Sequence, residues 1–170
     1  MADLKNRPSA LSEPEFVRLF GGVYEHSPWV AKQAWRQGVA SGHDDIEALA
    51  VLMASVVAAA SDQIKLDLIN AHPDLAGKAA VQGELTASST SEQASAGLGD
   101  CTKDEFERFQ RYNTAYKEKF GFPFIKAVRN SNRHEILSGF EERLQNNAET
   151  EFKTALAEID KIAAFRLQDL

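Results

Sequence analysis

Large apolar residues recur every three to four positions through most of the chain, the spacing that places them on one face of an α-helix. No segment of strand length alternates apolar and polar residues, and no internal repeat of 20–50 residues is present. The pattern therefore predicts an all-α protein, a single-domain bundle over residues 1–170 with roughly seven to nine helices. The stripes nearest the two ends of the chain consist of Phe16, Leu19, Phe20, Val23, Phe152, Leu156, Ile159 and Ala163.

Start and stop signals divide this pattern into helices. Ser12 with Glu15, and Thr102 with Glu105, have the spacing of the capping box that opens a helix. Further starts are expected at Ser27-Pro28, at Asp44 or Asp45, and at Ser61. Pro73 and Gly121 are expected to follow helix ends. The signals predict helices over 46–60, 131–146 and 150–167, with a long aromatic-rich helix from Thr102 to Gly121.

The middle of the chain has a different composition. From His72 to Asp100 it is rich in Ala, Gly, Ser and Thr and poor in large apolar residues. Such a segment contributes little to a core, so we expect it to carry loops and an active site.

Composition narrows the function. The chain of 170 residues is 44% hydrophobic and 26% charged, as in soluble globular proteins, and its net charge of −6 argues against nucleic acid as a partner. The lone Cys101 excludes an intramolecular disulfide and a thiol-rich metal site. The N-terminus has no secretory h-region, and the apolar stretch 46–60 is too short to span a membrane. We therefore expect a cytoplasmic protein without a membrane partner.

Common catalytic motifs are absent. The sequence has no His-Glu-x-x-His, Gly-x-Ser-x-Gly, P-loop or Gly-x-Gly-x-x-Gly. Its four histidines lie far apart, and none has a second histidine at helical spacing. We therefore expect no metal site.

His72 precedes Pro73 at an expected helix end. It has a structural interpretation, as a cap on the last carbonyls of its helix, and a chemical one, as an acid/base held by the rigid proline. Ser89 and Glu92 likewise have capping-box spacing, with Ser89 as the cap of a helix that begins there. The free N–H groups of such a helix start would also attract an anionic ligand near Glu92 and Gln93.

Arg129 follows the Gly121-Phe122-Pro123 break. It is interpreted either as a surface charge lying over aromatic residues or as a fork that binds a carboxylate or urea group. The cluster Glu25 to Trp29 fits a structural helix junction.

Together these segments resemble the 2-oxo-4-hydroxy-4-carboxy-5-ureidoimidazoline (OHCU) decarboxylases of urate degradation. The resemblance runs in unbroken order over roughly residues 10 to 168, which makes it more specific than any single motif. Its main motifs are Glu25-His26-Ser27-Pro28-Trp29, Ala71-His72-Pro73-Asp74-Leu75, Ser89-x-x-Glu92-Gln93 with Ala96-Gly97-Leu98, Phe120 to Ile125 with Arg129, and Arg166-Leu167.

The resemblance implies roles for individual residues. His72 becomes the key acid/base, and Glu92 is essential beside it. Implied contacts with the substrate are Pro73, Ser89, Thr90, Ser91, Glu92, Gln93, Phe124, Ile125, Lys126, Ala127, Val128 and Arg129. The chain departs from the family pattern at Arg36 to Ala40, which affects helix packing, and at Lys126, on the edge of the pocket.

The resemblance also implies a cofactor-independent carboxy-lyase that forms (S)-allantoin and CO₂ from a ureidoimidazoline, and a homodimer. The rival interpretation is a non-enzymatic helical scaffold or a ureide-binding protein. In that case Ser89 and Glu92 would only cap a helix, and His72 would only end one.

Overall fold

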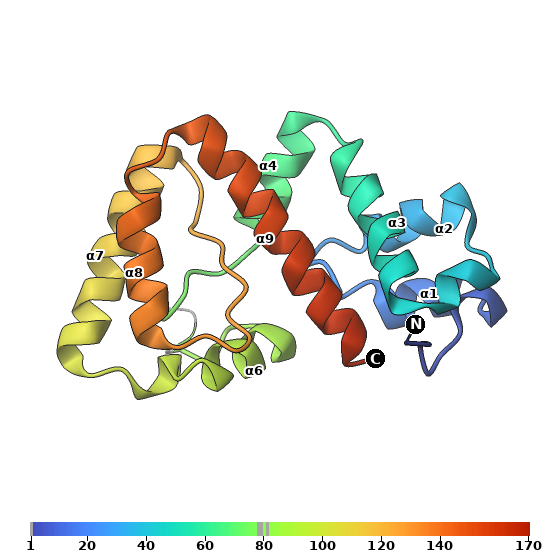
Figure 1. Ribbon diagram of the computed structural model, residues 1–170, viewed down its shortest axis with the longest axis horizontal. Coiled ribbons are helices and arrows are strands. Elements are labelled where there is room, and N and C mark those ends of the chain that lie inside the picture. Colours follow the sequence, from blue (N-terminus) through green and yellow to red (C-terminus); the bar gives the residue numbers. More distant parts are fainter. Residues whose placement is uncertain (1, 78–79, 81) are drawn as a thin grey trace. The chain divides into compact units, whose positions relative to one another are not determined.

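The computed structural model describes residues 2–77, 80 and 82–170. Within these residues it has no strand, only one isolated bridge between Asp3 and Asp45, and the ordered segments are helices (Figure 1). Eight α-helices and three short 3-10 helices lie in the described ranges. The all-α fold predicted from the hydrophobic pattern is confirmed.

The described chain forms two compact units, residues 1–71 with 159–170, and residues 72–158. The first unit holds η1 (Pro8–Ala10), α1 (Glu13–Phe20), α2 (Trp29–Gly38), η2 (Ser41–Asp44), α3 (Ile46–Ala58), α4 (Asp62–Asn70) and the last part of α9 (Ala148–Gln168). The second holds α6 (Ala87–Ser95), η3 (Leu98–Asp100), α7 (Lys103–Phe120), α8 (Arg133–Arg143) and the first part of α9.

The core of the first unit forms where α1 packs on α2 and α2 on α3. The ring of Phe16 is fully buried, 4.9 Å from the ring of Phe20 and 5.4 Å from that of Trp35. Arg166 pairs with Glu25 at 2.7 Å, with both side chains buried. The cluster Glu25 to Trp29 thus includes a buried ion pair, in keeping with its structural interpretation.

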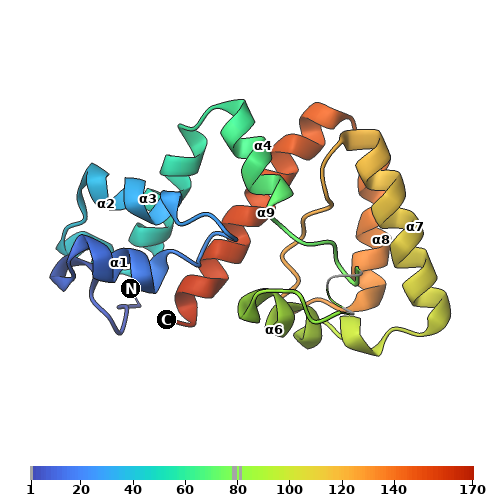
Figure 2. The ribbon, with the colours of Figure 1, turned by 180° about the vertical axis from the view of Figure 1, so that it is seen from behind.

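The core of the second unit is aromatic. The rings of Phe124 and Phe140 stack with centroids 3.8 Å apart, and Tyr116 meets both rings edge-on. Figure 1 and Figure 2 show α7 and α8 lying side by side in this unit, and these two helices contribute Tyr116 and Phe140. Phe124 comes instead from the irregular segment 121–130, so this segment is part of the core.

Most predicted helix starts are confirmed. Ser12 and Thr102 form capping boxes, while Asp45 and Ser61 cap α3 and α4 through their side chains. Gly121 ends α7 with φ +79°, a conformation that favours glycine. The helix expected over 131–146 is shorter, because Asn132 caps it at Arg133 and it ends at Arg143.

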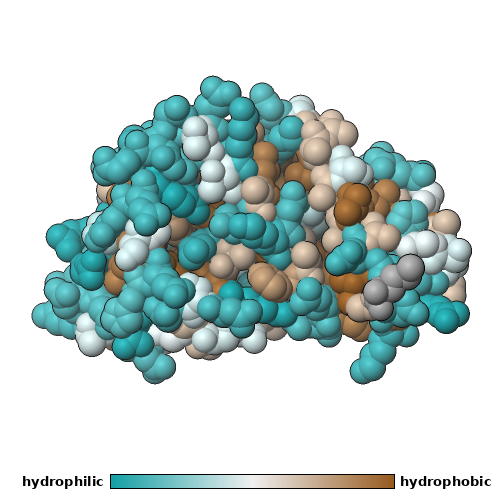
Figure 3. All heavy atoms as spheres, in the orientation of Figure 1, coloured by the Kyte–Doolittle hydropathy of each residue, from teal (hydrophilic) through white to brown (hydrophobic). Residues whose placement is uncertain are grey.

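Figure 3 shows hydrophilic residues over most of one face, with hydrophobic residues reaching the surface in small patches. Among the described residues, Val51 on α3 and Ile64 on α4 are large apolar side chains with 70% and 44% exposure. No single described helix is long and apolar enough to cross a membrane. Only α3 and α4 taken together reach that length and composition, and they are bent by 117° at the break between them.

Candidate functional site

His72 lies just after the end of α4 and belongs to the second unit. It is buried, with 8% of its surface exposed, and Pro73 follows it with a fixed φ. The next residues, Asp74 to Gly77, are irregular backbone. The conformation of this short segment therefore sets the direction in which the imidazole is presented.

Gln93 joins this segment to α6. Its side-chain Nε2 donates to the carbonyl of Asp74 (3.2 Å), and its Oε1 accepts from the N–H of Ala76 (3.0 Å). The helix that carries Glu92 is thereby tied to the segment that follows His72 and Pro73. The structure thus brings together the two motifs that the sequence predicted to act together.

The predicted start of α6 is wrong. The cap is Thr86, whose Oγ1 accepts from the N–H of Ser89 (3.2 Å), so the helix begins at Ala87. Ser89 is therefore inside the first turn, and Glu92 lies in the middle of the helix rather than at its third residue. Thr86 and Ser89 have the same hydroxyl chemistry, which is why spacing alone selected the wrong one. The prediction that the helix start lies beside Glu92 and attracts an anionic ligand there is therefore also wrong.

The predicted residues of α6 differ in exposure. Ser89 and Gln93 are buried, Glu92 is half-buried, and Thr90 and Ser91 are exposed. Because side chains three and four positions apart share a helix face, Ser89, Glu92 and Gln93 point to the more buried side.

Segment 121–130 carries the remaining predicted residues. Phe124, Ile125 and Val128 are buried, while Lys126, Ala127 and Arg129 are half-buried. The ring of Phe124 is stacked on Phe140 in the aromatic core, so it anchors the segment to the core. Polar groups of this segment that reach a ligand would come from its half-buried residues and its backbone.

A buried charge network, which was not predicted from the sequence, holds this segment in place. Arg143 pairs with Glu151 at 2.7 Å, donates to the carbonyl of Ile125, and lies over the ring of Phe124 with its guanidinium carbon 4.2 Å from the centroid. Tyr116 donates to the same Glu151 (2.6 Å). Burial, and then this hydrogen bond, raise the pKa of Tyr116 above its usual range. The signal that could have indicated the network is the position of Glu151, a charged residue at helical spacing from the buried Ala155 and Ile159 of α9.

A cavity of about 560 Å³ lies beside α6 within the second unit. It is mostly apolar and contains Thr90 and Gln93 but none of His72, Glu92 or 124–129. Cys101 lines it, and burial followed by the carboxylate of Glu105 raises the pKa of that thiol, which keeps it protonated. The remaining lining residues are Ala76, Ala80, Leu85, Ala94, Leu98, Gly99, Thr102, Lys103 and Phe106.

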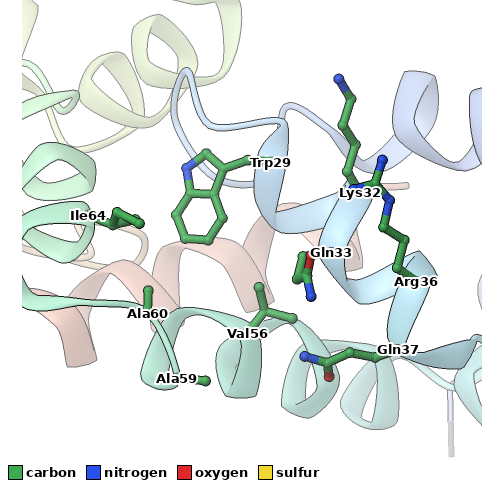
Figure 4. A pocket seen from close by; sticks show the side chains of 9 residues that line it. All are labelled: Trp29, Lys32, Gln33, Arg36, Gln37, Val56, Ala59, Ala60 and Ile64. Atoms are coloured by element: carbon green, nitrogen blue, oxygen red, sulfur yellow. The ribbon is translucent and has the colours of Figure 1, made fainter.

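The first unit has a separate groove of about 360 Å³ (Figure 4). Trp29 on α2 faces Val56 near the end of α3 and Ile64 on α4, while Lys32 and Arg36 extend along the rim. No predicted site residue lines it. In the described ranges, no three His, Cys, Asp or Glu side chains lie close enough together to hold a metal ion.

An all-α chain with a buried histidine joined to a carboxylate-bearing helix defines a protein class suited to acid/base chemistry. Comparison with known proteins identifies the family. The profile of OHCU decarboxylases matches residues 9–168, and the chain belongs to the OHCU decarboxylase family.

Two relatives that carry the name of this family match most of the chain. The 2-oxo-4-hydroxy-4-carboxy-5-ureidoimidazoline decarboxylase of Halalkalicoccus jeotgali is 44% identical over 155 residues, which cover 91% of this chain and 84% of that protein. The mouse protein of that name is 39% identical over 156 residues, covering 92% and 86% of the two chains. A "Uric acid degradation bifunctional protein" of a Bacillus species is 44% identical, and the chain spans 30% of its length.

Solved structures agree. The crystal structure of an (S)-allantoin synthase has a TM-score of 0.75 at 34% identity and covers 94% of this chain, which spans 50% of that one. The structure of an OHCU decarboxylase in the presence of (S)-allantoin has a TM-score of 0.68 and covers 94% of this chain and 97% of its own. At 21% identity, this second likeness concerns the fold alone.

Proposed function

We propose that this chain converts 2-oxo-4-hydroxy-4-carboxy-5-ureidoimidazoline to (S)-allantoin and CO₂ in urate degradation, without a cofactor. The observation that carries this proposal is the family match over residues 9–168, shared with relatives named for that reaction. The geometry supports it, because Gln93 joins the His72 segment to the helix bearing Glu92.

The chemistry fits a protein that supplies only acid/base groups. The reacting carbon of this substrate bears a hydroxyl and a carboxylate and adjoins an imine-like ring carbon. When the bond to the carboxylate breaks, CO₂ leaves and its electron pair moves into the adjacent C=N. The resulting enol-like intermediate, which carries a negative ring nitrogen, takes one proton at the former imine carbon. Its hydroxyl proton passes to the ring nitrogen, so that the hydroxyl becomes the ring carbonyl of allantoin. The substrate is thus its own electron sink, and delivery of the proton to one face sets the handedness of the product.

His72 moves this proton, because imidazole exchanges protons in both directions near neutral pH. Glu92 orients the imidazole or the substrate hydroxyl. Proposed contacts with the substrate are Pro73, Ser89, Thr90, Ser91, Gln93 and segment 124–129. Arg129 offsets the negative charge that develops.

Generating the unstable substrate from urate in situ tests the function. We expect the protein to accelerate CO₂ release and to give one allantoin enantiomer. His72→Asn is expected to lower kcat by about 10²–10⁴-fold, the usual worth of general acid/base help, while binding of an allantoin analogue changes little.

His134→Asn is the matched control, because this histidine on α8 is 74% exposed and is not among the predicted site residues. Its kcat is expected to equal that of the wild type. Near-normal decarboxylation by His72→Asn would contradict the assignment. Analogue binding without any catalysis by the wild type would favour the ureide-binding protein instead.

We further propose that residues 1–170 fold as one domain, that the protein is a homodimer, and that it acts in the cytoplasm. The first two are measured by unfolding in denaturant and by light scattering. A single transition with coincident fluorescence and circular dichroism, and a mass twice 18.7 kDa, are the expected results. Imaging of the tagged protein in its own cells is expected to show the third.

A further inference from the structure

Three neutral amide side chains bond the backbone of residues 74–76, which follows His72 and Pro73. Gln93 on α6 bonds Asp74 O and Ala76 N. On α7, Asn113 Nδ2 donates to Leu75 O (2.9 Å) and Gln110 Nε2 donates to Ala76 O (2.8 Å). We call Gln93, Gln110 and Asn113 the amide clamp.

The amide clamp holds a backbone that would not keep this shape alone. Ala76 has φ +51°, a left-handed conformation that costs a residue with a side chain about 1–2 kcal/mol. Such strain persists where the surroundings fix it from several sides, and both backbone polar groups of Ala76 are bonded to the amide clamp. At Gly77 an added Cβ would lie 2.7 Å from the Cβ of Asp74, so the turn is also tight.

The orientation of Asn113 follows from its partner. Because a carbonyl can only accept, the atom that faces Leu75 O must be the amide nitrogen, which fixes the flip of the side chain. Asn113 is buried, with 3% of its surface exposed, and its Oδ1 finds no hydrogen-bond partner among the described residues. A leucine of similar size would avoid this cost and pack well, so retaining the amide is explained by the bond to Leu75.

Resting on the proposed function, we propose that Gln110 and Asn113 are positioning residues of the decarboxylation. With Gln93, they hold the backbone beyond Pro73 and so fix the direction of the His72 imidazole. Gln93 contributes to this support through both of its amide atoms, each of which bonds the segment. Displacement of an acid/base group by about 1 Å can lower the rate of the reaction roughly 100-fold, so the position of the His72 backbone matters for catalysis.

Two variants test the proposal. In Asn113→Leu the bond to Leu75 is lost, and in the milder Gln110→Met the bond to Ala76 O is lost. Each is expected to lower kcat by about 10- to 100-fold with KM within about threefold of the wild type. Gln110→Lys keeps a donor at this position, and we expect it to restore most of the rate. Tyr112→Phe is the control, because Tyr112 is on the same helix and its hydroxyl bonds Glu141 instead.

Two readouts do not depend on turnover. Nuclear magnetic resonance measures the titration of the His72 ring and the hydrogen exchange of the Ala76 amide. Both are expected to change in Asn113→Leu and Gln110→Met and to stay unchanged in Tyr112→Phe. Loss of stability with an unchanged kcat, His72 titration and Ala76 exchange would show a purely structural role and overturn the proposal. An inactive wild type would instead refute the proposed function, and the two resonance readouts would still decide the positioning role.

Discussion

Segments 72–77 and 121–130 are both irregular backbone and both carry predicted site residues, but they are fixed by groups of different charge. The first is held by the neutral amide clamp, and the second by the pair Arg143–Glu151 with Tyr116. Neutral hydrogen bonds contribute about 1 kcal/mol each and tolerate small shifts. A buried charge without its partner costs far more. We therefore expect segment 121–130 to be held more rigidly than segment 72–77, whose geometry single substitutions can change.

The largest expected effect comes from breaking the charged support. Arg143→Met leaves Glu151, which has no exposed surface, without its cation, and should lower the free energy of unfolding by about 3–5 kcal/mol. Denaturant unfolding measures this. Adding Glu151→Leu removes the stranded charge and should recover much of the loss.

Arg133→Met is the matched control for burial. Arg133 pairs with Glu105 at the same 2.7 Å, but the two side chains are 30% and 11% exposed. We expect a loss of about 1 kcal/mol or less there. Equal losses in Arg143→Met and Arg133→Met would remove the distinction between the two kinds of support.

Alkaline pH should sharpen the comparison. The pKa of Tyr116 is raised in the folded protein by burial and by its bond to Glu151. Its contribution to stability is complete below the unfolded pKa of about 10 and is lost as the pH rises towards the folded pKa, by about 1.4 kcal/mol per pH unit. Tyr116→Phe should reduce this alkaline decline in stability. The measurement is the difference in unfolding free energy between about pH 9 and about pH 11, on either side of the unfolded pKa of tyrosine. The same slope in both proteins would contradict the coupling, and Asn113→Leu should keep the wild-type slope.

The smallest effect is expected at a charged contact of segment 72–77. Lys117 Nζ bonds Asp74 Oδ2 at 2.7 Å, but the two side chains are 46% and 27% exposed. Solvent screening limits such a pair to about 1 kcal/mol, so Lys117→Met should change stability and kcat little. The differences in stability and in kcat between Lys117→Met and the wild type should also change little when salt is added. A large loss of kcat would show that charge, and not the amide clamp, holds this segment.

Much of the fold was predictable because its signals are local. Helical spacing, the caps Ser12, Asp45, Ser61 and Thr102, and the stop at Gly121 each act within one turn of backbone. Thr86 was missed because four hydroxyl residues follow it within five positions, and only the path of the backbone decides which hydroxyl caps α6. The position of Glu92 changed with it, from the first turn to the middle of the helix.

The support of the candidate site was less predictable. Gln110, Asn113 and Lys117 recur at helical spacing on α7, on a face next to its aromatic residues. That pattern alone indicates a solvated helix face. Gln110 and Asn113 bond backbone carbonyls 34 and 38 residues earlier, whereas Lys117 bonds the carboxylate of Asp74, 43 residues earlier. Backbone groups carry no side-chain signal, so the sequence does not indicate the two amide bonds. Arg143 and Glu151 are likewise ordinary surface residue types whose burial only packing reveals.

The sequence by itself determined the helical class, most helix boundaries, the family and the motifs around His72 and Glu92. These follow from periodicity, short-range capping and ordered motifs, all of which are written in consecutive residues. Only the tertiary structure decided which cap starts α6, that Gln93 bonds the His72 segment, and that one segment is held by amides and the other by buried charge. Those features depend on desolvation and on hydrogen bonds between distant residues, whose strength is set by burial in the folded chain.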